Sequence, residues 1–230
     1  MSQSKIFVDI GNSAVKWRTI ESNVYSKSVD EFLLNTLPQA NNSWVSAVAN
    51  SHIVENLEDH FDTVHLVNSQ SKFNNLKISY DDASTLGSDR FLAMLGATEH
   101  FPNKALLIID IGSAMTFDVI NEDGYHQGGL IMPGLGALRK SFSKFETTDL
   151  STNIDGLVSN TTDAWKSGTQ SMLLSSINSQ IEKFNEIYSD GIVTICGGLV
   201  NEIKIELPEP VQIFDNLVLD GLECYSQTVG

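Results

Sequence analysis

One short element occurs twice in this chain, about a hundred residues apart, and it constrains the fold more than any other feature of the sequence. The first copy, IFVDIGNSAVKW, begins at Ile6, and the second, LIIDIGSAMTFDV, begins at Leu107. Each copy is an apolar strand-like run followed by an aspartate, a glycine two positions later, small polar residues and a second strand-like run. The repeat predicts two lobes of related structure, each opening with the same strand, turn and strand.

Composition limits the partners and the location of the chain. With 230 residues, 41% of them hydrophobic, it is long enough for one large domain or two small lobes. Fourteen basic and 29 acidic residues give a net charge of −15, which repels nucleic-acid phosphates and anionic membrane surfaces. We therefore expect neither a nucleic-acid nor a membrane partner. Because the two cysteines form no paired framework and MSQSKIFVDIG lacks the apolar core of a signal peptide, the expected location is cytoplasmic.

Hydrophobic periodicity and turn residues predict an α/β chain with a first lobe over residues 1–103 and a second over 104–230. The strands expected in the first lobe lie near 5–9, 13–20, 23–29, 43–49 and 63–67, and its helices near 30–37, 51–60 and 84–101. The elements expected in the second lobe are strands near 105–111, 114–120, 125–131, 191–196 and 211–214, a helix over 159–184, a short helix after Gly198 and a final helical stretch.

For two of these helices the sequence also predicts which side is apolar. The apolar stripe of the helix over 84–101 comprises Phe91, Leu92, Leu95 and, less regularly, Met94. Ser84 or Ser88 can cap its start. One side of the helix over 159–184 carries Trp165, Gly168, Met172, Leu173, Ile177 and Ile181. That side is expected to form core or a dimer interface.

The two D-I-G turns have two readings. Gly11 and Gly112 can simply permit tight turns, with the aspartates as caps. Alternatively, each glycine lets backbone N–H groups approach an anion closely, while the strand-terminal aspartate holds a cation or its water shell. The chain contains no G-x-x-x-x-G-K-[ST] and no G-x-G-x-x-G. A P-loop and a dinucleotide-binding Rossmann turn are therefore not expected.

The repeat resembles the actin, sugar-kinase and heat-shock ATPase superfamily, and the finer motifs resemble one kinase family within it. The motifs are DIGNSAVKW, YDDASTLGSDRFLA, DIGSAMTFD, GGLIMPG, SNTTDAWKSG, CGG and NLVLDGL. They occur in the order, and at about the spacing, of a type III pantothenate kinase. The resemblance implies two actin-like (ribonuclease H-like) lobes, with mixed sheets flanked by helices and an ATP cleft between them. It also implies transfer of the γ-phosphoryl of ATP to pantothenate, the first step toward coenzyme A.

The resemblance further implies a set of nucleotide contacts and two cations. Asp9 binds Mg²⁺ or its water shell, and the first phosphate loop includes Gly11, Asn12, Ser13 and Lys16. Lys16 reaches the phosphates as a point charge, although a solvated strand residue is an equal alternative. In the second loop Asp110 holds a monovalent cation, K⁺ or NH₄⁺, and Ser113 contacts the nucleotide. Asp118 is a weaker candidate, because an acidic residue that ends a strand is often only a surface residue.

Substrate recognition is expected around the G-S-D-R segment. Arginine occurs only as Arg18, Arg90 and Arg139, so an arginine next to Asp89 at a helix start stands out. The pair can be a local ion pair, worth about 0–1 kcal/mol at a surface. Alternatively, Arg90 binds the pantothenate carboxylate with its guanidinium fork and Asp89 accepts the hydroxyl proton. The resemblance adds four further residues to the pantothenate pocket: Tyr80, Gly87, Ser88 and, from the partner subunit of a homodimer, Thr161.

Several positions have open alternatives or depart from the family pattern. Thr161 can instead be a helix cap. The segments GGLIMPG and CGG look like close backbone approaches, and either can be only a turn. Ala83 replaces a common proline, which is expected to loosen the pantothenate-side loop. Ser113, Met115 and Cys196 replace threonines, which puts phosphate-donor affinity and choice in doubt.

Two other functions remain open at the level of sequence. One is a non-catalytic nucleotide-binding protein of the same fold that acts as a regulatory or scaffold partner. The other is a kinase of another small hydroxy acid, with the same phosphate loops and a different pocket around Tyr80 and Thr161. The intact G-S-D-R segment argues against the first.

Overall fold

The computed structural model describes residues 4–229 except residues 21, 153, 155 and 201–209. The chain divides into two compact units. The first comprises the chain up to Asn103, Glu122–Gln127 and the segment from Asp215 onward, and the second comprises Lys104–Asn121 and Gly128–Phe214. The chain first passes from one unit to the other after Asn103, which is the expected boundary. Residues 122–127 and 215–230, which were expected in the second lobe, lie in the first unit.

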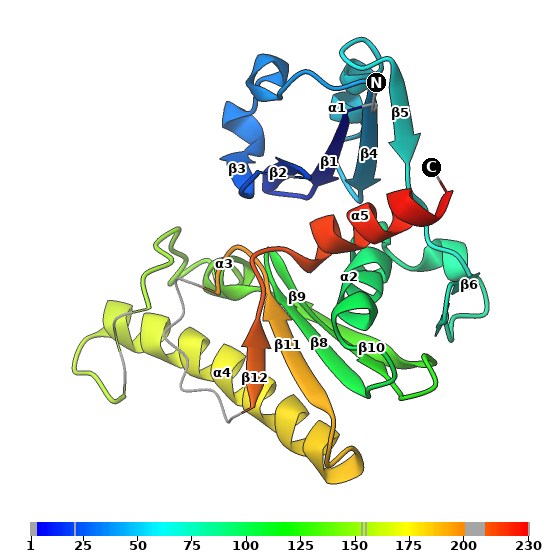
Figure 1. Cartoon of the computed structure of the whole chain (residues 1–230). Coiled ribbons are helices and arrows are strands. Elements are labelled where there is room, and N and C mark those ends of the chain that lie inside the picture. The colour runs from blue at the N-terminus through cyan, green and yellow to red at the C-terminus, as the bar shows by residue number, and fades with distance from the viewer. Residues whose placement is uncertain (1–3, 21, 153, 155, 201–209, 230) are drawn as a thin grey trace. The chain divides into compact units, whose positions relative to one another are not determined.

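Each unit is built on a five-stranded sheet, and the two sheets have equivalent strand orders, β3-β2-β1-β4-β5 and β10-β9-β8-β11-β12 (Figure 1). The strands of the first sheet are β1 (Lys5–Ile10), β2 (Ala14–Thr19), β3 (Tyr25–Ser28), β4 (Asn42–Ala47) and β5 (Thr63–Leu66). Those of the second are β8 (Leu106–Ile111), β9 (Ala114–Ile120), β10 (His126–Pro133), β11 (Ile192–Cys196) and β12 (Val211–Ile213). In both sheets the repeated element forms an antiparallel pair, β1–β2 or β8–β9, and its first strand runs parallel to β4 or β11. The predicted pair of related α/β lobes is confirmed.

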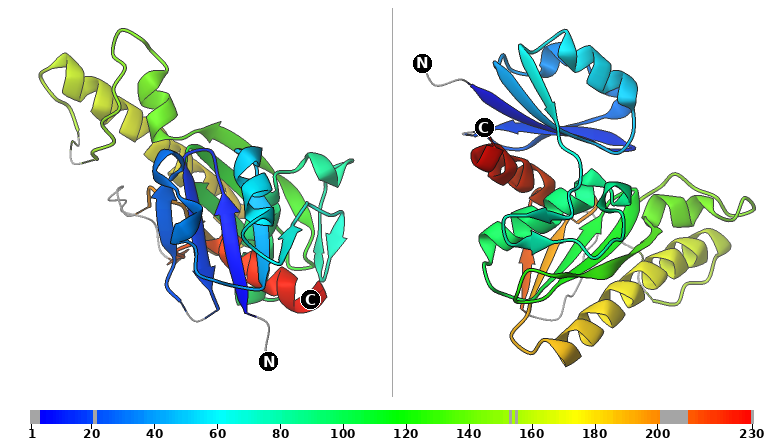
Figure 2. Two further views of the ribbon diagram at one scale, coloured as in Figure 1. Left: turned by 90° about the horizontal axis from the view of Figure 1, so that it is seen from above. Right: turned by 90° about the vertical axis from the view of Figure 1, so that its right-hand side faces the viewer.

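One face of each sheet packs against a helix. In the first unit alternate residues of β1, Ile6, Val8 and Ile10, pack in a core with Ile53 and Leu57 of α1 (Ser51–Glu58). In the second unit the long helix α4 (Thr161–Ile187) lies along the sheet (Figure 2). Because side chains alternate between the faces of a strand, Asp9 and Asp110 point to the opposite face from these cores.

The buried side of α4 is narrower than expected. Leu173, Ile177 and Ile181 are buried in the core of the second unit, as predicted. Gly168 and Met172 are exposed, Met172 at 57%, so these two residues lie outside the core, and a dimer interface on this side of the helix stays a prediction. Each fully buried leucine or isoleucine contributes about 1.5–3 kcal/mol, enough for three of them to fix the helix on the sheet.

Helix α2 (Ser88–His100) packs against the last helix, α5 (Leu217–Val229), within the first unit. Two glycines allow this close approach. A Cβ atom at Gly221 would lie 2.0 Å from the Leu92 carbonyl oxygen, and one at Gly96 would lie 2.4 Å from the Leu217 carbonyl oxygen. The predicted apolar residues of α2 are all buried, Met94 included. The predicted caps are wrong, because Gly87 is the N-cap residue and makes no side-chain cap.

The remaining elements are short. The 30–37 region forms two 3₁₀ turns, η1 (Val29–Glu31) and η2 (Leu34–Thr36). The sequence patterns missed the β6–β7 hairpin (Lys72–Phe73 and Leu76–Lys77), the turn η3 (Ala83–Thr85) and helix α3 (Leu135–Lys140). The short helix predicted after Gly198 falls largely on residues 201–209, outside the described part of the chain.

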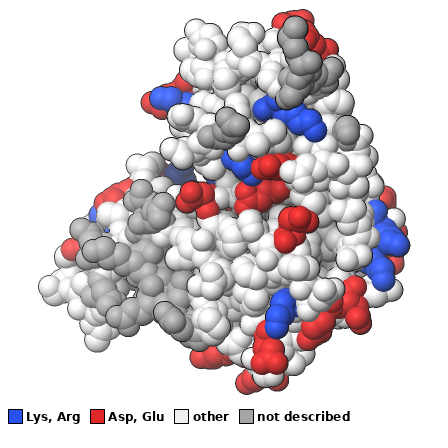
Figure 3. All heavy atoms as spheres, in the orientation of Figure 1, with Lys and Arg blue, Asp and Glu red and all other residues white. Residues whose placement is uncertain are grey.

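The surface carries charges of both signs. On the face shown in Figure 3, acidic side chains lie in several separate patches, with smaller basic patches between them. None of the helices in the described ranges is both long and apolar enough to cross a membrane.

Candidate functional site

The first D-I-G turn joins β1 to β2 and carries three polar side chains on one face of the sheet. Asp9 lies directly opposite Lys16 in β2 and beside Ser46 in β4, so the three side chains share the face that points away from the core. Asp9 is 8% exposed, and Lys16 is half-buried. Asn12 and Ser13 are exposed at the tip, and the Asn50 side-chain amide donates to the Gly11 carbonyl oxygen at 2.8 Å. The turn is therefore anchored at its base and open at its tip.

The second turn, between β8 and β9, is one residue shorter and is closed by a similar hydrogen bond. The Gly112 N–H donates to the Ala114 carbonyl oxygen at 3.0 Å, as the Gly11 N–H donates to the Ala14 carbonyl oxygen at 3.0 Å. Neither glycine is among the described residues with positive φ, and a Cβ at either position would lie 3.4 Å from its nearest neighbour. The fold itself thus has little need of glycine at these positions. Glycine at these two positions would instead leave room for a ligand that passes close to the backbone.

Two other glycines press against the second turn. A Cβ at Gly134 would lie 2.2 Å from the Gly112 carbonyl oxygen. A Cβ at Gly197, whose φ is +116°, would lie 2.5 Å from the Ile111 N and O atoms and 2.6 Å from the Asp110 Oδ1 atom. The close backbone approaches predicted from GGLIMPG and CGG are confirmed. Gly134 and Gly197 surround the turn that carries Asp110 and Ser113.

Three other residues near the second turn are buried. Met115 and Cys196 are each 1% exposed, and Met115 packs in the core of the second unit. Asp118 is only 2% exposed, so the surface alternative for it is wrong. The register pairs Asp110 with Thr116 and Ile108 with Asp118, which places both aspartates on one sheet face.

The G-S-D-R segment begins α2 at the carboxyl edge of the first sheet. The Ser88 hydroxyl lies 3.3 Å from the Ser46 hydroxyl, one strand away from Asp9. The Arg90 N–H donates to Asp89 Oδ1 at 2.7 Å. A Cβ at Gly87 would lie 2.5 Å from that same oxygen, so the glycine leaves room for the carboxylate. The structure thus brings Asp89 to the strand edge that also carries Asp9, where ligands bind in open α/β sheets.

Arg90 is buried, 6% exposed, and is held by an aromatic ring. Its Nη1 atom donates to the Tyr80 hydroxyl at 3.0 Å, and the guanidinium carbon lies 5.9 Å from the Tyr80 ring centroid. The structure therefore brings together two residues that the resemblance places in one pocket. A buried, oriented guanidinium is well suited to bind a carboxylate with two parallel hydrogen bonds.

The loop before this segment is held without the missing proline. Asp82 caps η3, and its Oδ1 atom accepts from the Ser84 N–H at 2.9 Å and from the Ser84 hydroxyl at 2.6 Å. These bonds hold the pKa of Asp82 below its usual value. The Thr85 hydroxyl donates to the Asp82 carbonyl oxygen at 2.7 Å. Hydrogen bonds thus restrain the turn at Ala83, where the sequence predicted a looser loop.

Thr161 is the first residue of α4 and is exposed. The cap of this helix is Asn160, whose Oδ1 atom accepts from the Asp163 N–H at 2.9 Å. The alternative that Thr161 is the cap is therefore wrong. Its hydroxyl lies on the surface of the second unit, where a partner molecule can reach it.

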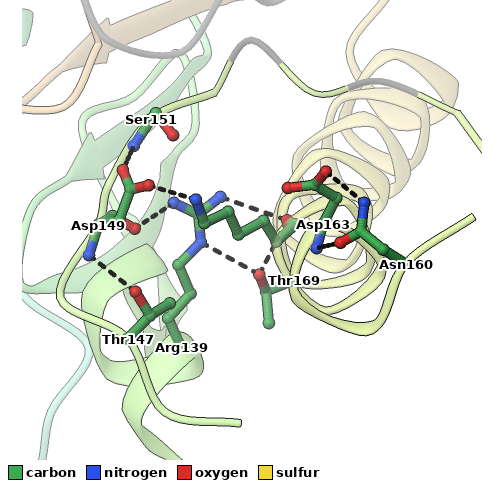
Figure 4. Close-up of polar contacts among 8 residues, drawn as sticks. Arg139, Thr147, Asp149, Ser151, Asn160, Asp163 and Thr169 are labelled. Atoms are coloured by element: carbon green, nitrogen blue, oxygen red, sulfur yellow. Dashed lines mark hydrogen bonds and ion pairs between the residues drawn. The ribbon is translucent and has the colours of Figure 1, made fainter. Parts of the chain in front are cut away.

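The segment that leads to α4 is held by Arg139, which is fully buried (Figure 4). Its guanidinium donates to the carbonyl oxygens of Asp149 at 2.6 Å and Lys166 at 3.2 Å, and to the Thr169 hydroxyl at 3.3 Å. Asp149 also pairs with the Lys166 ammonium group, and that contact together with the Ser151 N–H holds the pKa of Asp149 well below its usual range. Arg139 is therefore a structural arginine that joins α3, residue 149 and α4.

Replacing Arg139 with methionine is expected to lower the free energy of unfolding by about 1–3 kcal/mol, because buried carbonyl oxygens lose their donors. The matched change Lys166→Met removes an ion pair whose Asp149 side chain is 43% exposed. It is expected to change stability by about 0–1 kcal/mol. Urea unfolding of the two variants and the parent protein measures both values. Equal effects would contradict the role given to Arg139.

The described residues contain no group of three or more His, Cys, Asp or Glu side chains arranged to hold a metal ion. Mg²⁺ in nucleotide-using enzymes is commonly bound by one or two carboxylates together with substrate phosphates and water. Asp9 meets that need as a single carboxylate at a strand end. Asp110 offers one carboxylate at the base of the second turn, and carboxylate oxygen is a type of ligand that hard cations prefer.

Comparisons with known proteins agree with this geometry. The family model described as type III pantothenate kinase matches residues 5–183. The type III pantothenate kinase of Colwellia psychrerythraea is 29% identical over 247 residues, covering 96% of this chain and 99% of that protein. The type III pantothenate kinase of Chromobacterium violaceum is 29% identical over 232 residues, covering 95% and 97%.

Solved structures with the same fold are more distant in sequence. A Campylobacter jejuni protein of the Baf family, provisionally described as a transcriptional activator, has a TM-score of 0.65 at 21% identity, covering 97% of this chain and 98% of that one. MreB5 of Spiroplasma citri bound to AMPPNP has a TM-score of 0.56 at 12% identity, covering 100% and 97%. At these identities the likeness shows the fold alone.

The doubled sheet, with a D-I-G turn at the head of each copy, places this protein in the class of proteins with an actin-like fold. Within that class, the match over residues 5–183 and the near full-length relatives identify the family more narrowly. The chain belongs to the type III pantothenate kinase family.

Proposed function

We propose that this protein transfers the γ-phosphoryl group of ATP to the primary hydroxyl of pantothenate, giving 4′-phosphopantothenate and ADP, the first step of coenzyme A synthesis. The observation that carries the proposal is the start of α2. There, Asp89 lies next to a buried Arg90 that Tyr80 orients, on the strand edge that also bears Asp9. A kinase of a hydroxy acid needs both a base for the hydroxyl and a cation for the carboxylate, and this segment supplies the two together.

On the acceptor side Arg90 binds the pantothenate carboxylate, and this contact aligns the substrate so that its hydroxyl lies at Asp89. The hydroxyl oxygen forms a bond to the γ-phosphorus while the bond from that phosphorus to the bridging oxygen of ADP breaks. Asp89 takes the hydroxyl proton. Because the transition state is loose, proton removal comes late, and a carboxylate at a helix N-terminus is basic enough for this task. Gly87 and Ser88 line the same pocket with their backbone.

On the donor side the tip of the first turn, Asn12 and Ser13, follows the phosphate chain, and Gly11 leaves it room. Lys16 places a positive charge beside the phosphates from the strand position opposite Asp9. Asp9 would hold Mg²⁺, directly or through water, and this ion neutralises charge on the phosphates when bound. The half-buried state of Lys16 supports the phosphate contact over the solvated alternative.

In the second unit we assign Ser113 to the nucleotide and Asp110 to a monovalent cation, K⁺ or NH₄⁺. Support comes from the close approaches of Gly134 and Gly197, which pack against the turn that carries both residues. Carbonyl and carboxylate oxygens are suitable ligands for such a cation. Ser113 keeps the hydroxyl that the family's threonine provides.

We further propose a homodimer in which Thr161 of one subunit completes the pantothenate pocket of the other. The exposed position of Thr161 at the start of α4 and the exposure of Met172 and Ile187 on the same helix support this assembly. Light scattering on the purified protein measures its mass. A monomer that phosphorylates pantothenate at full rate would contradict the shared site.

Replacing Arg90 with lysine is expected to raise the KM for pantothenate about 10-fold or more, since a lysine keeps the charge but loses the bidentate fork. The KM for ATP should change less than about twofold. The control is Arg18→Lys, the same change at a residue that bridges Asp220 at 2.9 Å and Glu223 at 2.8 Å. Steady-state kinetics with each substrate varied in turn give the four values. A parallel rise in both KM values would contradict a carboxylate contact.

The proposal is tested by incubating the desalted protein with ATP and Mg²⁺, with and without pantothenate, and with and without K⁺. We expect 4′-phosphopantothenate by mass spectrometry, in an amount that depends on K⁺. If the folded protein gave no product with pantothenate but phosphorylated another hydroxy acid, the second alternative, a kinase of that hydroxy acid, would be favoured. Binding of ATP with no acceptor-dependent ADP release would favour the non-catalytic nucleotide-binding alternative.

A further inference from the structure

The tip of the β9–β10 hairpin belongs to the first unit, although both strands lie in the second sheet. The Lys77 N–H donates to the Gly124 carbonyl oxygen at 2.9 Å, and the Lys77 ammonium group lies 4.0 Å from the Tyr125 ring centroid. Gly124 has a φ of +78°, and a Cβ there would lie 2.2 Å from the Asn75 carbonyl oxygen. The tip is thus fixed in one position against the β6–β7 hairpin.

His126 follows this tip and is 2% exposed. Its imidazole is stacked on Tyr80, with ring centroids 5.9 Å apart and planes 21° apart, and its Nδ1 atom lies 3.4 Å from the Ser79 hydroxyl. Tyr80 in turn accepts a hydrogen bond from Arg90 at 3.0 Å. Three side chains, from β10, the loop before η3 and α2, are therefore linked by successive contacts: the imidazole contacts the tyrosine ring, and the tyrosine hydroxyl contacts the guanidinium.

We propose that His126 is a positioning residue for the acceptor site. It fixes the plane of the Tyr80 ring, so that the phenol oxygen holds the Arg90 guanidinium in the orientation that binds a carboxylate. This inference rests on the proposed function and extends it to a residue that makes no contact with the reacting atoms. An unsupported Tyr80, only half-buried, would sample other rotamers, and the guanidinium would be less well oriented when substrate arrives.

The main test is the variant His126→Ala. It is expected to raise the KM for pantothenate about 3- to 10-fold, the range that loss of one aromatic stack permits, while kcat and the KM for ATP change less than about twofold. His126→Phe keeps a flat ring and should restore most of the pantothenate KM. His65→Ala is the matched control, because His65 is stacked on Trp44 at 4.1 Å and 13° in the same unit but away from Arg90. It should leave the pantothenate KM unchanged.

A double-mutant cycle separates positioning from ordinary packing. In a Tyr80→Leu background the further change His126→Ala should have no additional effect on the pantothenate KM, since the ring that the imidazole supports is gone. Additive effects, an unchanged KM in His126→Ala, or a rise in the ATP KM of the same size would each overturn the inference. Parent protein that makes no 4′-phosphopantothenate would instead refute the proposed function. Active parent protein with any of those three results refutes only the role of His126.

Discussion

Asp89→Asn is expected to lower kcat about 10²- to 10⁴-fold, the usual contribution of a general base. An asparagine Oδ1 atom can still accept the Arg90 N–H that now donates to Asp89 at 2.7 Å, so the start of α2 should keep its geometry. The KM for pantothenate and that for ATP should therefore change little. Asp89→Ala should abolish turnover altogether, because it removes the proton acceptor and this backbone contact together.

The matched control is Asp81→Asn, an isosteric change at an exposed aspartate shortly before the same helix. Its kcat should stay within about twofold of the parent value. The kinetics are measured at saturating ATP with thermal unfolding recorded for each variant. Turnover that survives in Asp89→Asn would mean that another group takes the hydroxyl proton.

Gly197→Ala is expected to impair both stability and activity more than any other single change proposed outside the acceptor pocket. The new methyl group would overlap the Ile111 backbone and the Asp110 carboxylate, at a φ of +116° that side chains rarely adopt. We expect a loss of about 1–3 kcal/mol in the free energy of unfolding and, in the folded fraction, loss of K⁺-dependent activity. The reason is that the overlap can be relieved only by moving the second turn.

Gly198→Ala provides the control, because a Cβ at that exposed position would meet no atom within 4 Å. Urea unfolding and activity at varied K⁺ are measured for the pair. If the two variants had equal stability and equal K⁺ dependence, the close approach of Gly197 would have no part in the site.

Local sequence signals predicted the elements that depend on neighbouring residues. The strands of both D-I-G units follow from apolar runs and turn glycines, and the observed β1, β2, β8 and β9 lie within a residue or so of the expected ranges. Both caps were wrong for one reason. The position at which each helix begins decides the cap, and the sequence pattern misplaced it by one residue at α4, where Asn160 and not Thr161 is the cap, and at α2, where it is Gly87.

The arrangement of the site was predictable only in part. Antiparallel register places Lys16 opposite Asp9, and adjacency in sequence places Arg90 beside Asp89. The sequence did not predict that Ser46 and His126 belong to the site. Ser46 reaches it because β4 pairs with β1, and His126 reaches it because its ring stacks on Tyr80, and both contacts join residues that are far apart in the sequence. The membership of residues 122–127 and 215–230 in the first unit is non-local in the same way. Sequence periodicity reports which face of an element is buried but does not report its partner.

The packing of α5 on α2 has a consequence for how the protein matures during synthesis. Leu217, Val218, Leu219 and Leu222 are buried, and Gly221 packs closely against the backbone of α2, the helix that contains Asp89. Domains usually fold as units while the chain leaves the ribosome, the N-terminal one first. Here the first unit cannot close until residues 217–229 have emerged, so the helix that carries Asp89 and Arg90 gains this packing partner only after the second unit has been synthesised. Competence for catalysis should therefore arise only once residues 217–229 have been translated.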